Sequence, residues 1–254
     1  MNGTHETTRT RQRSQFAKRS LDVVLSLAAL AVAALPLAAV AIWVRFDSPG
    51  PILFRQIRVG RGGRPFHIHK FRTMRVGADR EGLLTVGGDS RITRSGRVLR
   101  KLKIDELPQL FDVLVGNMSL VGPRPNVSRE TDLYTAEERK MLDVRPGITD
   151  MASIAFSDEE ELLASMPNPH LAYDQFVRPW KSRLGLFYVS YGDLGLDLQL
   201  IVLTAFAVVS RRRARLALSR LLKKRGAPVD LVRVASRRDP LEASPPPGAT
   251  RIVV

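Results

Sequence analysis

The chain has 254 residues, of which 44% are hydrophobic and 26% are charged, and its formal net charge is +15. This length suits one ordinary domain with peripheral segments better than two full domains. The absence of cysteine excludes disulfides, zinc–thiolate sites and cysteine nucleophiles. The positive charge favours anionic partners, which are nucleic acid, anionic lipid headgroups or phosphorylated substrates.

An uncharged apolar run extends from residue 23 to residue 44, close to the roughly 20 residues that span a bilayer. The alternative is a buried core helix. Basic residues flank the run on both sides, so the positive-inside bias places both ends in the cytoplasm. Pro36 lies within the run and would bend a helix. We therefore expect a disordered basic N-terminus over residues 1–15 and a re-entrant membrane helix over residues 16–47, with a straight span as the alternative.

A β-hairpin is predicted next, because residues 52–59 and 65–74 are rich in strand formers and flank a glycine-rich turn. These glycines match neither a P-loop nor a dinucleotide-binding fingerprint, since a strand follows them. His67 and His69 share one face of the second strand and could bind a metal. No third ligand lies nearby in the sequence, so an exposed strand face is the preferred interpretation. A loop is expected after the hairpin, around residues 77–89.

Two helices are predicted from apolar spacing, one over residues 94–103 and one continuing from residue 107 to residue 114. Pro108 fits only the first turn of the second helix. Asp105 and Glu106 would then lie at its N-terminus, where free N–H groups and the helix dipole favour negative charge. This position would keep Asp105 ionised, as a carboxylate nucleophile or a magnesium ligand requires. The alternative is an ordinary helix cap.

Several arginines accompany this acidic pair. Arg100 precedes it, Arg124 lies between two prolines, and Arg145 precedes a Pro-Gly turn. Arginine suits bidentate contacts to phosphate, and flanking prolines restrict the local backbone. Adjacent carboxylates with positioned arginines suit phosphoryl transfer, in which charge neutralisation and positioning provide most of the catalysis. The acidic run at 158–161 is interpreted as the acidic start of a helix and not as a metal site.

The C-terminal part contains an apolar segment, a basic segment and a tail. Residues 198–209 are mostly apolar, and residues 211–225 are basic and contain no acidic residue. The basic segment predicts an interfacial helix at a membrane surface, with a solvated basic helix as the alternative. The composition of residues 226–254 predicts a disordered tail.

Six short strings match one known family when they are taken together. They are Lys18-Arg19 with Asp22, Ser48-Pro49-Gly50-Pro51, Lys70-Phe71-Arg72-Thr73-Met74, Asp105-Glu106-Leu107-Pro108-Gln109-Leu110, Asn117-Met118-Ser119-Leu120-Val121-Gly122-Pro123-Arg124-Pro125, and Arg145-Pro146-Gly147-Ile148-Thr149. Over roughly residues 16–210 the chain resembles the bacterial sugar transferase family, the monotopic phosphoglycosyltransferases that act on polyprenyl phosphate.

The resemblance implies a mainly helical α+β fold with a re-entrant N-terminal membrane helix, a short β-hairpin and interfacial amphipathic helices. Residues 48–210 would form the catalytic domain, at the cytoplasmic face of the bacterial inner membrane. The expected reaction moves a sugar-1-phosphate from a UDP-sugar to polyprenyl (undecaprenyl) phosphate and starts the assembly of an exopolysaccharide or another glycoconjugate. Membrane lipids are expected partners, a homodimer is possible, and no nucleic acid is expected.

The resemblance also implies roles for individual residues. Asp105 would attack the β-phosphorus, release UMP and carry the phosphosugar until polyprenyl phosphate takes it. Glu106 would act as an acid/base or as an orienting group. Mg²⁺ would neutralise the diphosphate, with Asp105 as its protein ligand. The residues expected to bind phosphate or nucleotide are Lys70, Arg72, Arg100, Arg124 and Arg145.

Two strings depart from the family pattern. Many members have Ser-Pro at the helix bend, where this chain has Leu35-Pro36. Many members also continue the last string with Gly-Trp-Ala-Gln, where this chain has Asp150-Met151-Ala152-Ser153. The second difference lies in a region expected near the sugar.

Two other classes of function were weighed. A membrane-associated nucleic-acid-binding protein is supported by the net charge alone, and aromatic residues make up only 6% of the chain, too few for an evident stacking platform. A non-catalytic scaffold of a glycan-assembly complex would not need the intact Asp105-Glu106 pair.

Overall fold

The computed structural model describes residues 3–78, 82, 85 and 88–253, and the side chains from residue 15 onward. The helices are α1 (Gly3–Asp47), α2 (Arg94–Leu102), α3 (Gln109–Leu114), α4 (Ser128–Thr131), α5 (Met151–Ala155), α6 (Glu159–Ala164), α7 (Pro169–Ala172), α8 (Arg178–Tyr191), α9 (Leu194–Val209), α10 (Arg211–Lys224) and α11 (Val229–Ser236). The strands are β1 (Leu53–Val59), β2 (Pro65–Phe71), β3 (Ser119–Val121) and β4 (Gly147–Thr149). The short 3-10 turns are η1 (Arg61–Gly63), η3 (Ile104–Glu106) and η4 (Glu138–Asp143), and η5 (Tyr173–Val177) is a π-helical turn.

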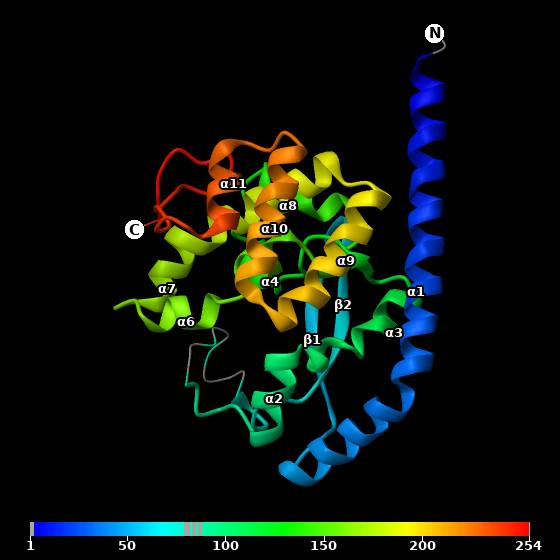
Figure 1. The fold of residues 1–254 in the computed structure, drawn as a ribbon, viewed down its shortest axis with the longest axis vertical. Coiled ribbons are helices and arrows are strands. Elements are labelled where there is room, and N and C mark those ends of the chain that lie inside the picture. The colour runs from blue at the N-terminus through cyan, green and yellow to red at the C-terminus, as the bar shows by residue number, and fades with distance from the viewer. Residues whose placement is uncertain (1–2, 79–81, 83–84, 86–87, 254) are drawn as a thin grey trace.

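The fold is mainly helical, as predicted, with α1 running along one side of a rounded body (Figure 1). Strands β1 and β2 form the predicted antiparallel hairpin, with Leu53 opposite Phe71 and Val59 opposite Pro65. Strands β3 and β4 pair in parallel. The predicted loop over residues 77–89 falls partly on residues outside the described ranges.

Helix α1 is continuous through Pro36, and its ribbon bends in the half that contains this proline (Figure 1). Its part from Gln15 to Asp47 is long and apolar enough to cross a membrane, by length and composition. Only 6% of the most apolar stretch is buried within the protein, which disfavours the alternative of a buried core helix.

The helix already begins at Gly3, which differs from the disorder predicted for residues 1–15. No glycine or proline separates Thr4 from the apolar run. An established helix can therefore extend toward the N-terminus, because each added residue contributes a hydrogen bond without a new nucleation step.

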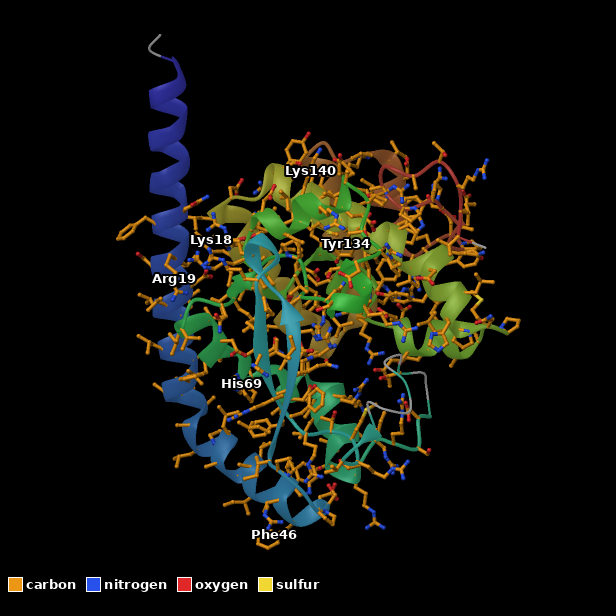
Figure 2. All side chains as sticks on the ribbon, turned by 180° about the vertical axis from the view of Figure 1, so that it is seen from behind. Lys18, Arg19, Phe46, His69, Tyr134 and Lys140 are labelled. Atoms are coloured by element: carbon orange, nitrogen blue, oxygen red, sulfur yellow. The ribbon has the colours of Figure 1, made fainter. Side chains whose placement is uncertain are left out.

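Three side chains of α1 attach it to the body of the protein. Lys18 Nζ contacts Asp197 Oδ2 (2.7 Å), and Arg19 donates to Val113 O (2.6 Å). Asp22 Oδ1 accepts the N–H of Leu120 (3.1 Å). Figure 2 shows Lys18 and Arg19 on the side of α1 that faces the body, and Phe46 at its far end. The first matched string therefore joins α1 to the body of the protein.

Arg72 fixes the other end of α1. Its Nε donates to Pro51 O (2.6 Å), and its two terminal nitrogens donate to Ser48 Oγ (2.7 Å), Pro49 O (2.8 Å), Val44 O (3.3 Å) and Ser48 O (2.7 Å). These bonds use all five donors of the guanidinium. The Ser48–Pro51 turn is thereby held against the end of β2.

The main hydrophobic core joins α5, α8, α9, α10 and α11. Ala214, Leu218 and Leu222 of α10 are completely buried, because their spacing of four residues places them on one face that packs in this core. This corrects the prediction that residues 211–225 form an interfacial helix, since the apolar face of α10 is covered by protein.

The tail predicted to be disordered over residues 226–254 also differs from the structure, although residue 254 itself is not described. Leu231, Val234 and Ala235 of α11 are buried in the main core. Beyond α11, Trp180 Nε1 donates to Glu242 O (3.0 Å) and Arg183 donates to Pro245 O (2.9 Å). Helix α8 thus supplies partners for backbone carbonyls of a segment with little apolar content of its own.

Candidate active site

Asp105 and Glu106 lie in η3, the turn between α2 and α3. Lys103 has φ of 59°, and this left-handed residue ends α2 and redirects the chain. Helix α3 begins only at Gln109, with Pro108 as its N-cap, so the acidic pair precedes α3 and is not part of its first turn. Both acidic residues are nearly buried, at 7% and 8% exposed.

Both carboxylate oxygens of Glu106 are bound. Its Oε1 accepts from Lys70 Nζ (2.8 Å) and from Arg124, and its Oε2 accepts from a second nitrogen of Arg124 (3.2 Å). Burial by itself raises the pKa of Glu106, but the charges of Arg124 and Lys70 outweigh burial and hold this pKa well below its usual range. Glu106 is therefore an ionised carboxylate held between two cations.

Asp105 has the opposite character. Its Oδ1 is buried and has no hydrogen-bond partner among the described residues. Burial raises the pKa of Asp105, and the neighbouring charge of Glu106 raises it further. Burial and the like charge of Glu106 therefore oppose the ionised form of Asp105, which the expected helix N-terminus would favour. The result is a buried carboxyl with one oxygen free to interact.

The acidic pair opens into a cleft of about 2350 Å³ that Lys70, Arg100 and Arg124 also line. Burial lowers the pKa of Lys70 to about 8, and the Arg124 charge adds to this effect. The charge of Glu106 raises the pKa of Arg124. The structure thus brings together Asp105, Glu106, Lys70 and Arg124, while Arg100 lies in the same cleft and pairs with Glu160.

Two other arginines predicted to bind phosphate already donate hydrogen bonds to backbone carbonyls. Arg72 borders the cleft, but the turn before β1 uses all of its donors. Arg145 Nε donates to Gly116 O (3.0 Å), and this side chain lies near Arg19. Burial lowers the pKa of Arg145, and the Arg19 charge lowers it further. The geometry therefore assigns Arg72 to holding the fold and leaves it no donor for the predicted phosphate contact, whereas Arg145 is not among the residues that line the cleft, and its binding role stays a prediction.

The structure also places the two histidines of β2. His67 is exposed, whereas His69 Nδ1 contacts Asp112 Oδ1 (2.7 Å) and its backbone N–H donates to Asp112 Oδ2 (2.9 Å). Asp112 is completely buried, so this pair fastens β2 to α3. Within the described part of the chain, no group of three or more His, Asp or Glu residues could hold a metal.

The string at Asp150–Ser153 serves as a helix cap. Asp150 Oδ1 accepts the N–H of Ser153 (2.6 Å), and Ser153 Oγ accepts the N–H of Asp150 (3.1 Å), which forms a capping box for α5. Met151 and Ala152 are buried in the core, and Ser153 lines the cleft. Of the four residues that differ from the family pattern here, only Ser153 therefore faces the candidate site.

One wall of the cleft has no signal in the sequence. It contains Arg58 from β1, Glu130 from α4, Glu159 from α6, Tyr173 from η5 and Lys181 from α8. These residues come from five elements and belong to no local motif, so only the tertiary fold brings them together.

Known proteins similar to this chain include UDP-glucose:undecaprenyl-phosphate glucose-1-phosphate transferases. That of Xanthomonas campestris pv. campestris is 38% identical over 205 residues, which cover 78% of this chain and 40% of that protein. That of Caulobacter vibrioides is 47% identical over 141 residues, which cover 54% of this chain and 53% of that protein.

A third relative has a different sugar in its name. The UDP-N-acetylgalactosamine-undecaprenyl-phosphate N-acetylgalactosaminephosphotransferase of Aeromonas hydrophila is 42% identical over 143 residues, which cover 55% of this chain and 34% of that protein. The chain thus spans between a third and about half of the length of these three relatives. The family model described as bacterial sugar transferase matches residues 13–211, and the chain belongs to this bacterial sugar transferase family.

Proposed function

We propose that this protein transfers a sugar-1-phosphate from a UDP-sugar to undecaprenyl phosphate and so initiates the assembly of an exopolysaccharide or another glycoconjugate. The observation that carries the proposal is the buried Asp105, with one free carboxylate oxygen, beside Lys70 and Arg124 in a large cleft. The names of the three relatives support the same reaction class.

Asp105 acts as the nucleophile in a two-step reaction. One of its carboxylate oxygens attacks the β-phosphorus, the bond from this phosphorus to the oxygen bridging the two phosphates breaks, and UMP leaves with that oxygen. A phosphate oxygen of undecaprenyl phosphate then attacks the same phosphorus, and the carboxylate of Asp105 leaves. The products are UMP and undecaprenyl-diphosphosugar, and the enzyme is regenerated.

The two cations next to Asp105 bind the phosphates during this reaction. Arg124 offers a planar fork to phosphate oxygens, and Lys70 offers a compact positive charge. Such positioned charges supply most of the stabilisation in phosphoryl transfer. Of the two roles considered for Glu106, orienting Lys70 and Arg124 is favoured, because a carboxylate with a low pKa and both oxygens bound is a poor proton donor at neutral pH.

Magnesium fits this site. Protein-bound Mg²⁺ commonly takes one or two carboxylates together with substrate phosphates and water. Asp105 would hold it, because its buried Oδ1 has no partner among the described residues. When bound, Mg²⁺ would neutralise charge on the diphosphate.

The decisive experiment supplies the purified protein in lipid nanodiscs with a panel of UDP-sugars and measures UMP. The proposal expects UMP release that needs Mg²⁺ and undecaprenyl phosphate for repeated turnover. Without the lipid acceptor, mass spectrometry should detect one phosphosugar attached to the peptide that contains Asp105. Absence of both UMP and the adduct with every UDP-sugar would instead support a non-catalytic scaffold.

The proposed location is the cytoplasmic face of the bacterial inner membrane, with α1 entering and leaving on the same side. The exposed apolar surface of α1 and its bend support this arrangement. Gln15 and Arg61 flank the membrane segment and are both exposed. With Gln15→Cys and Arg61→Cys made singly, an impermeant thiol reagent should label both in inside-out vesicles and neither in spheroplasts. If one cysteine were labelled only in inside-out vesicles and the other only in spheroplasts, α1 would be a straight span.

A further inference from the structure

The cleft continues past the acidic pair to the wall formed by Arg58, Glu130, Glu159, Tyr173 and Lys181. We call these five residues the far wall. The catalytic roles proposed above use none of them, although each one lines the same cleft as Asp105.

The far wall begins next to the catalytic residues. Arg58 donates to Pro125 O (3.2 Å), and the N–H of Val59 donates to Asn126 O (2.9 Å). Strand β1 is therefore bonded directly to the loop that carries Arg124, which holds Glu106. A group covalently linked to a phosphate at Arg124 would lie within reach of this wall.

The opposite end of the cleft lies nearer the membrane helix. Leu99 of α2 packs against Val44 of α1, Arg97 of α2 lines that side of the cleft, and Arg100 reaches across to Glu160 of α6. Helix α2 lies near the far end of α1, whereas α4 lies in the body away from that end (Figure 1). A lipid phosphate arriving from the membrane would meet the α2 side first, which leaves the far wall to the donor.

Internal contacts order the far wall without a ligand. Lys181 Nζ forms an ion pair with Glu159 and lies 5.3 Å from the centre of the Tyr173 ring. Tyr173 begins the π-helical turn η5, an irregularity that is frequent at functional sites. Burial raises the pKa of Tyr173 to about 12, so its hydroxyl remains a hydrogen-bond donor at neutral pH.

The charges of the far wall balance one another. Arg58 and Lys181 are cations, and Glu130 and Glu159 are carboxyls, whereas Lys70, Lys103 and Arg124 outnumber Asp105 and Glu106 beside them. Phosphate is therefore drawn to the Lys70 end. A balanced wall of donors and acceptors instead suits an uncharged group with many hydroxyls. It is a poor uracil platform, because Lys181 covers one face of the Tyr173 ring.

We propose that the far wall binds the sugar ring of the donor and selects an uncharged hexopyranose, with Glu130, Tyr173 and Lys181 contacting its hydroxyls. This inference rests on the proposed function, since it assigns the sugar subsite of that same reaction. Tyr173 and Lys181 are then specificity-determining residues.

The test compares Tyr173→Phe and Lys181→Gln with the wild type for three ligands: the preferred UDP-sugar, UMP as an inhibitor, and undecaprenyl phosphate. Loss of one neutral hydrogen bond should raise the KM for the UDP-sugar about threefold to tenfold in Tyr173→Phe, and loss of a charged group should have a larger effect in Lys181→Gln. UMP lacks the sugar, so its inhibition constant should stay the same, as should the KM for the lipid. Unchanged UMP binding also reports that each variant is folded.

The matched control is Tyr191→Phe, because Tyr191 lies on the same helix as Lys181 but is 59% exposed and packs on Phe187. Its KM for the UDP-sugar should equal that of the wild type. A UDP-hexuronate should also react at least tenfold less efficiently than the matching neutral UDP-hexose, because its carboxylate would add a net charge to a wall whose two cations and two carboxyls balance.

Three results would overturn the sugar subsite. The first is an unchanged KM for the UDP-sugar in both variants. The second is a weakening of UMP inhibition as large as the rise in the KM for the UDP-sugar, which would place the nucleoside at the wall. The third is a rise confined to the KM for the lipid. A preference for the hexuronate would overturn the assigned selectivity. Failure of the proposed function looks different, because the wild type would then release no UMP from any UDP-sugar.

Discussion

The candidate active-site cleft and the junction between α1 and β1 each depend on one arginine, but the two arginines are used differently. Arg72 donates four hydrogen bonds to the Ser48–Pro51 turn and one to Val44 O of α1, so no donor remains for a ligand. Arg124 is bound to the carboxylate of Glu106 in the cleft. A ligand phosphate can exchange with a carboxylate partner, whereas it cannot replace backbone carbonyls that hold a turn closed.

An arginine in a matched string is therefore not by itself a phosphate ligand. What decides is the set of groups that already accept its hydrogen bonds. Four experiments test the contrast between the cleft and the junction, ordered by their expected effect on the rate.

Asp105→Asn should have the largest effect. The amide keeps the shape of the side chain but is a poor nucleophile, so UMP release should fall on the order of 10³-fold or more, as losses of catalytic nucleophiles do. The phosphosugar adduct should disappear, while the melting temperature stays near that of the wild type. UMP release at a near-normal rate would exclude Asp105 as the nucleophile.

Arg124→Lys comes next. Lysine keeps the charge but loses the planar fork, so kcat/KM for the UDP-sugar should fall about 10²-fold. Glu106→Gln is a useful companion, because it leaves both cations in place but removes the charge that holds them. If Arg124→Lys lowered the melting temperature as much as Arg72→Lys does, the cleft and the junction would not differ as described.

The pH dependence of the rate should identify Lys70. Its pKa is lowered to about 8, so the side chain is a cation below that pH and becomes neutral as the pH rises through it. If the cation binds the diphosphate, kcat/KM should be level below pH 8 and fall about tenfold per pH unit above it. Lys70→Arg stays charged, so its level region should extend to higher pH. An identical alkaline fall in this variant would assign the titration to another group.

Arg72→Lys should have the smallest effect on the rate and a clear effect on stability. Several buried carbonyls would lose their donors, which costs about 2–4 kcal/mol. The melting temperature should therefore fall by about 5–10 °C, as measured by thermal unfolding in detergent. The rate per folded molecule should stay within about threefold of the wild type, and a 10²-fold loss would return Arg72 to the catalytic machinery.

The sequence alone predicted the hairpin, the helix over residues 94–103 and the apolar N-terminal helix, because each follows from a local pattern of residues. It also identified Asp105, Glu106, Lys70 and Arg124, which the structure brings into one site. These residues lie in or beside continuous strings whose order along the chain is itself the signal.

The tertiary structure alone decided matters that depend on which groups meet. It buried the apolar face of α10 and the helix α11, which local composition had assigned to the membrane surface and to a disordered tail. It also gave Asp105 and Glu106 opposite electrostatic character, because two cations reach one carboxylate and burial dominates the other. Burial, hydrogen-bond partners and charge neighbours come from residues far apart in the chain. The sequence therefore located the acidic pair and its two neighbouring cations, and the fold decided what each of them can do there.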